Sequence, residues 1–84
     1  MSGYSTNPVN YPVYRKLEGF ERYYEITDDR HFREAFITQQ QVSYHLIEAK
    51  QFPEMLRIQD MISLEWKYVP MSEEEIARFF PKAQ

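Results

Sequence analysis

The sequence predicts a small α+β domain in which a short strand is followed by two helices, a β-hairpin and a C-terminal helix. Three observations predict this order. Apolar residues recur at helical spacing between residues 28 and 50, they alternate with polar residues between 56 and 69, and a helix-capping motif follows at residue 72. The 84 residues are enough for one small domain. A chain of this size buries roughly 60–65% of its unfolded surface, so its margin of stability is small.

The first 14 residues differ from the rest of the chain. They carry no charged side chain and contain two prolines, and they show neither a helical nor a strand period. We therefore expect a flexible N-terminal arm at residues 1–14 and one globular domain at residues 15–84. Tyr4, Tyr11 and Tyr14 are candidates for binding a partner from this arm, because a tyrosine ring buries a large area at a small cost in conformational entropy.

A strand is expected at residues 20–26, directly after Gly19. Phe20, Tyr24 and Ile26 share one parity there, although Arg22 interrupts that face with a charge. The alternation predicts a short strand that opens the domain.

The next stretch is typical of a helix at residues 28–36. Thr27 is a suitable N-cap, and the acidic residues that follow favour the positive end of a helix dipole. Phe32, Ala35 and Phe36 stand at positions i, i+3 and i+4, which predicts one apolar stripe for the core.

A second helix is expected at residues 39–50, with Thr38 as its cap. The positions that follow helical spacing are Val42, His45, Leu46 and Ala49. This helix would carry almost no charge, because no Asp, Glu, Lys or Arg occurs between Ala35 and Ile47.

Two interpretations remain open for the segment after Pro53. Apolar residues share even parity on both sides of Gln59-Asp60, which favours a hairpin whose arms contain Leu56, Ile58, Ile62, Leu64, Trp66 and Tyr68. In the hairpin, Trp66 would belong to the core. The alternative is a helix that begins with Pro53 at its first position and buries Met55, Ile58 and Ile62.

The C-terminal helix has the clearest signals. Ser72 and Glu75 are spaced as a capping box, in which each side chain accepts the backbone N–H of the other residue. Pro81 stops the helix. The expected buried stripe consists of Ile76, Phe79 and Phe80.

The composition excludes several kinds of chemistry. The chain has no cysteine, so disulfides, thiolate zinc sites and thiol catalysis are ruled out. Its two histidines, His31 and His45, stand in no metal-binding spacing, and the two glycines form no phosphate-binding loop. We therefore expect no metal, no cofactor and no catalysis. No apolar run approaches the ~18 residues of a membrane span, and a cytoplasmic protein is expected.

The predicted order of elements is that of a winged helix-turn-helix domain. The stretch VSYHLIEAKQFP at residues 42–53, followed by LRI, resembles the recognition helix and first wing strand of excisionase and MerR-type domains. The stretch WKYVPMSEEEIARFF at residues 66–80 is similar to the end of the same family, and the resemblance covers residues 24–80. Lys50 stands where the family has a turn glycine, and Gln59-Asp60-Met61 provides no basic residue for a wing.

The resemblance implies a small sequence-specific DNA-binding protein that inserts a helix into the major groove, with a homodimer as one arrangement. Glutamine can pair with adenine through two hydrogen bonds, and lysine or arginine can contact phosphates. The candidate residues for double-stranded DNA are Gln39, Gln40, Gln41, Ser43, Tyr44, Lys50, Arg57 and Lys67, with Arg30 and Arg33 as further phosphate contacts.

The alternative is a protein-interaction module or accessory subunit that uses the same fold. The net charge of −3 and the uncharged surface at residues 35–47 favour this hypothesis, with the tyrosine-bearing arm lying along the partner. Charge geometry discriminates the two. DNA binding requires the basic side chains to converge on the face that carries Gln39–Gln41, whereas an apolar or acidic face favours a protein partner.

Overall fold

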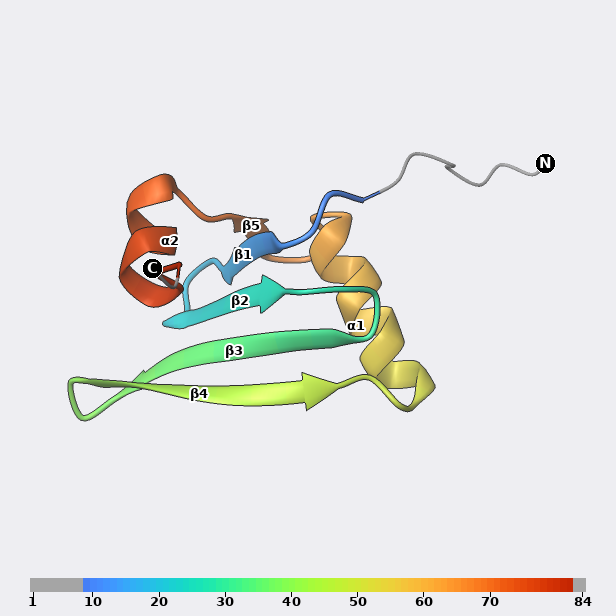
Figure 1. Cartoon of the computed structure of the whole chain (residues 1–84), viewed down its shortest axis with the longest axis horizontal. Coiled ribbons are helices and arrows are strands. Elements are labelled where there is room, and N and C mark those ends of the chain that lie inside the picture. The colour runs from blue at the N-terminus through green and yellow to red at the C-terminus, as the bar shows by residue number, and fades with distance from the viewer. Residues whose placement is uncertain (1–8, 83–84) are drawn as a thin grey trace.

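In the computed structural model, which describes residues 9–82, the chain forms a five-stranded antiparallel sheet with one helix on each face (Figure 1). The strand order is β4-β3-β2-β1-β5, so β4 and β5 are the two edges. The strands are β1 Val13–Leu17, β2 Arg22–Ile26, β3 His31–Thr38, β4 Gln41–Glu48 and β5 Tyr68–Pro70, and the helices are α1 Phe52–Ile62 and α2 Glu73–Phe79.

The two predicted helices at 28–36 and 39–50 are wrong, because this part of the chain forms the β3–β4 hairpin. Its register pairs Phe32 with Ile47 and Thr38 with Gln41. Gln39 and Gln40 form the two-residue turn, both with positive φ (50° and 66°), as the twist of a tight hairpin requires. The winged-helix fold predicted from the sequence is therefore wrong.

Burial on both faces of the sheet explains why the sequence of β3 shows helical spacing. Phe32 is buried against α1 on one face, and Ala35 is buried against α2 on the other. Apolar residues therefore occur at both parities, and the alternation that marks a one-sided strand is lost. Asp28 does not begin a helix either. Its carboxylate accepts the backbone N–H of Arg30 at 2.8 Å, which forms a tight turn between β2 and β3.

The hairpin predicted at residues 56–69 is also wrong, and the alternative helix at this position is confirmed as α1. Pro53 is the second residue of α1, and the carboxylate of Glu54 accepts the backbone N–H groups of Lys50 and Gln51 at 3.0 and 3.2 Å. Of the predicted second strand, only β5 forms. Trp66, expected in the core, is 70% exposed and has a positive φ of 56°.

Two elements agree with their sequence signals. The strand expected at residues 20–26 is confirmed as β2, and the C-terminal helix is confirmed as α2. Ser72 caps α2, with its hydroxyl accepting from Glu75 N at 3.1 Å while the Glu75 carboxylate accepts from Ser72 N at 2.9 Å. No helix within residues 9–82 has the length and apolar character needed to cross a membrane.

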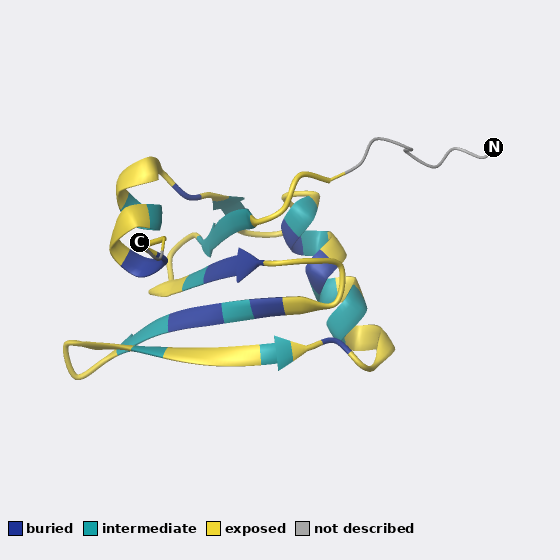
Figure 2. Cartoon of the chain, in the orientation of Figure 1, coloured by how far each residue is buried: buried dark blue, intermediate teal, exposed yellow. Residues whose placement is uncertain are grey.

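The core consists of two clusters separated by the sheet. The cluster on the face that α1 covers, here the α1 face, contains Tyr24, Ile26, Phe32, Ala49, Ile58, Met61 and Tyr68. The cluster on the opposite face, the α2 face, contains Ala35, Met71, Phe79 and Phe80. Figure 2 shows buried residues in β2 and β3, whereas β4 is largely exposed. The arrangement leaves β4 as the least covered long strand.

Candidate functional site

The edge strand β4 is the most exposed apolar element among residues 9–82. Along this strand Val42, Tyr44 and Leu46 point to the α2 face, and they are 38%, 41% and 79% exposed. No Asp, Glu, Lys or Arg interrupts the strand between Gln41 and Glu48. Exposed apolar side chains in one row mark a binding surface more often than isolated ones do.

The backbone of β4 offers hydrogen bonds along its outer side. Ala49 N donates to Arg30 O at 2.6 Å, just beyond the hairpin register. Because bonded residues alternate in an antiparallel pair, the odd-numbered residues of β4 bond to β3, while the N–H and C=O groups of Val42, Tyr44 and Leu46 point outward. A segment that pairs with this edge would bond to the same residues whose side chains form the apolar row.

Tyr44, at the middle of the row, is held in place by α2. Its hydroxyl donates to Phe79 O at 2.5 Å, and the guanidinium of Arg33 lies 5.7 Å from its ring and 5.2 Å from that of Phe80. Arg33 itself forms an ion pair with Glu25 at 2.6 Å. The edge is therefore preorganised, which lowers the entropy cost of binding a partner.

On the α1 face, a buried polar network supports the strands behind β4. Glu34 is only 8% exposed, and its carboxylate accepts the Tyr24 hydroxyl at 2.9 Å and lies 3.4 Å from Arg57. Burial and the hydrogen bond to Glu34 raise the pKa of Tyr24 to about 12. His45 of β4 reaches the same network, with Nδ1 3.7 Å from Glu34. The strand β3, with which β4 pairs, is therefore held in place by this network.

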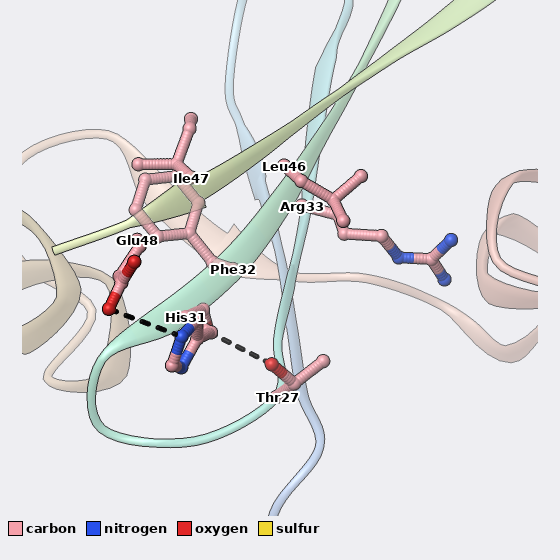
Figure 3. A pocket seen from close by; sticks show the side chains of 7 residues that line it. All are labelled: Thr27, His31, Phe32, Arg33, Leu46, Ile47 and Glu48. Atoms are coloured by element: carbon pink, nitrogen blue, oxygen red, sulfur yellow. Dashed lines mark hydrogen bonds and ion pairs between the residues drawn. The ribbon is translucent and has the colours of Figure 1, made fainter.

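A pocket of about 330 Å³ lies at the end of β4 (Figure 3). In Figure 3 the side chain of His31 lies near Glu48, with Leu46 and Arg33 on the other side of the pocket. The His31 ring is 2.8 Å from Asp28 and 3.8 Å from Glu48. The hydrogen bond to Asp28 raises the pKa of His31. At this end of β4, the apolar side chains of Phe32, Leu46 and Ile47 line the pocket together with the titratable ring of His31.

The residues predicted to bind DNA are dispersed over the molecule. Gln41, Ser43 and Tyr44 share β4, but Tyr44 points to the α2 face and the other two point to the α1 face. Gln39 and Gln40 form the turn at one end of β4, whereas Lys50 follows its other end.

The predicted phosphate-binding residues also lie apart from one another. Arg57 is engaged with Tyr24 and Glu34 on the α1 face, and Arg33 lies on the α2 face. Lys67 precedes β5, with its ammonium 5.8 Å from the Phe20 ring and 5.7 Å from the Trp66 ring. Arg30 lies in the turn between β2 and β3. The basic side chains therefore do not converge on the glutamines.

The tyrosines assigned to the N-terminal arm have different environments. Tyr4 lies outside the described residues. Tyr11 is 36% exposed ahead of β1. Tyr14 belongs to β1 and not to an arm, since its hydroxyl donates to Glu25 at 3.0 Å and its ring lies 5.9 Å from that of Phe80. The sheet therefore begins before Arg15.

Sequence reasoning found the uncharged segment at residues 35–47 but missed its form. Val42 and Leu46 follow helical spacing in the sequence, whereas the structure exposes both on an edge strand. Their β-strand signal is the alternation of Val42, Tyr44 and Leu46 with Ser43 and His45.

Comparison with protein-family models, with curated proteins and with solved structures finds no match to this chain. Within residues 9–82, no three His, Asp or Glu side chains are grouped so that they could hold a metal ion.

Proposed function

We propose that this protein is a non-catalytic interaction module that binds an extended segment of a partner protein along the outer edge of β4. The single observation that carries the proposal is the eight-residue edge strand, whose outward backbone groups and exposed apolar side chains belong to the same three residues. Strand addition to a sheet edge uses both, since main-chain hydrogen bonds provide affinity and alternate side chains provide specificity.

The absence of protective features on β4 supports this role. Proteins usually block an exposed edge with lysine, proline, a bulge or a very short strand. β4 contains neither lysine nor proline, and its register with β3 runs without interruption from His31–Glu48 to Thr38–Gln41. Such an edge accepts strands readily, so a partner that covers it would also protect the protein from aggregation.

Charge geometry favours a protein partner over duplex DNA. The helix that DNA recognition required is a strand, and the basic candidates are spread over both faces of the sheet. DNA binding stays a prediction that a filter-binding measurement with pooled duplexes can test. The apolar edge corresponds to the uncharged surface that the alternative hypothesis placed at residues 35–47.

The test is peptide selection against the purified full chain, with random linear peptides displayed on phage. Selected peptides are expected to carry apolar residues at alternate positions and to shift the backbone NMR signals of Val42, Tyr44 and Leu46. In Leu46→Lys the affinity is expected to fall about tenfold, because a lysine on the edge opposes strand addition.

The matched control is Leu64→Lys, which changes another exposed leucine (45% exposed) outside β4. This variant is expected to bind the selected peptides as tightly as the wild type. Selected peptides whose NMR shifts map elsewhere, or whose affinity survives Leu46→Lys, would contradict the proposal.

A further inference from the structure

We infer that the partner strand is β4 of a second copy of this chain, paired antiparallel about a two-fold axis through Tyr44 to make one continuous sheet. The inference rests on the proposed function, because it names the segment that the β4 edge accepts. Most homo-oligomers are closed two-fold dimers in which the same patch of both subunits meets itself. In this arrangement, apolar residues of β4 face apolar residues of the second copy, and polar residues face polar ones.

The pairing follows from the direction of the backbone groups. The outward N–H and C=O groups belong to even-numbered residues, and outward residues of two antiparallel strands bond to one another. A two-fold axis through Tyr44 pairs this residue with its own copy. It also places Val42 opposite Leu46 of the second copy, and the symmetric pair repeats the contact. All three exposed apolar positions of the edge are then covered by apolar partners.

Charge and polarity fit the same register. On the α1 face, Ser43 lies opposite His45 of the second copy. At the strand end, Glu48 comes opposite Gln40 of the second copy, a turn residue that carries no charge. No pair of like charges faces each other along this strand, and such pairs would oppose association.

Neighbouring registers fit less well. An axis through His45 would place Val42 opposite the Glu48 carboxylate and would bring two imidazoles together. An axis through Ser43 would place Leu46 opposite Gln40, a residue of the turn. Register in a sheet is set by which side chains meet across the pair, so the Tyr44 axis is preferred.

The first part of the test is sedimentation equilibrium of the full-length chain over a range of concentrations. We expect a reversible monomer–dimer equilibrium, a roughly tenfold weaker dimer for Leu46→Lys and an unchanged dimer for Leu64→Lys. Both substituted side chains are exposed, and far-UV circular dichroism checks that both variants keep the fold.

The second part tests the register with cysteines, since the natural chain has none. Ser43→Cys and His45→Cys are purified separately and mixed under mild oxidation. Opposed residues of this type have Cα atoms ~4.5 Å apart, within the range of a disulfide. The mixture is expected to form a covalent dimer containing one chain of each variant. Each variant alone should cross-link much less, because its cysteines are then diagonal to each other.

The outcomes separate the two proposals. A wild-type chain that stays monomeric while selected peptides bind β4 overturns the self-pairing and leaves the proposed function intact. A monomeric chain that also binds no peptide overturns both. A dimer that is insensitive to Leu46→Lys, or that cross-links equally well through either single variant, overturns the pairing about Tyr44.

Discussion

The two edge strands of the sheet, β4 and β5, differ in length, in proline content and in the exposure of their side chains. β5 contains three residues and ends in Pro70, which has no N–H to offer a further strand. Its first residue, Tyr68, is only 7% exposed and packs in the core with its ring 5.8 Å from that of Tyr24. β4 has eight residues and no proline, and its Leu46 is 79% exposed.

The difference shows two ways to build a sheet edge. The edge at β5 is stabilised by contacts with the core, whereas the edge at β4 exposes the groups that we propose bind a partner. β5 is short because the chain turns directly from it towards α2, and it contributes to the fold by burying an aromatic ring. β4 is fixed on one side by its full register with β3, and no other strand within residues 9–82 pairs with its outer side. Substitutions at β5 should therefore change stability, whereas substitutions at β4 should change binding.

The largest expected effect that tests this comparison is on folding. Tyr68→Ala removes a buried aromatic ring from the α1 face, and we expect the free energy of unfolding to fall by about 3–4 kcal/mol. Leu46→Ala, on the exposed edge, should change it by no more than about 0.5 kcal/mol. Urea denaturation of both variants measures the two values. Equal losses would show that β4 is as important for folding as β5.

The second prediction concerns the turn that leads into β4. Replacing Gln39-Gln40 with Asn-Gly is expected to raise the free energy of unfolding by about 1–2 kcal/mol, because asparagine and glycine adopt positive φ more readily. Thermal and urea denaturation measure the gain. Gln41→Asn, in the regular strand beside the turn, is the matched control and should not stabilise the protein. A loss of stability in the Asn-Gly variant would argue against the tight turn.

The smallest effect is expected at the other end of β4, where His31 lies near Asp28 and Glu48. The hydrogen bond to Asp28 raises the pKa of His31, so the folded state binds the proton more tightly than the unfolded state does. The resulting stabilisation is complete below the ordinary histidine pKa of ~6.5 and is lost as the pH rises through the raised value. The effect is modest because His31 is exposed.

The measurement for His31 is the free energy of unfolding of the wild type and of His31→Gln between about pH 5 and pH 8.5. The wild type should lose more stability than the variant across this window. His45→Gln serves as a histidine control on the same hairpin. Parallel pH profiles for the wild type and His31→Gln would show that the ion pairs of His31 do not stabilise the folded state.

Local sequence signals determined those parts of the protein whose stability comes from neighbouring residues. Ser72 and Glu75 cap α2 through contacts three residues apart, and the alternation around Tyr24 marks β2. The uncharged character of residues 35–47 is likewise evident from the sequence, and residues 41–47 of this segment lie in the largely exposed strand β4. The proposal of a protein-interaction surface at this segment can therefore start from the sequence, whereas the geometry of the segment cannot be predicted from it.

Only the tertiary structure decided that residues 31–48 form strands and residues 52–62 form a helix. Two helices cover opposite faces of one sheet, so β3 needs apolar residues at both parities, and its Phe32, Ala35 and Phe36 fall at helical spacing by coincidence. In α1, Ile58 and Met61 meet the strands from only one side. Burial by distant segments outweighed local periodicity, and strand order placed the apolar row of β4 at one edge of the five-stranded sheet.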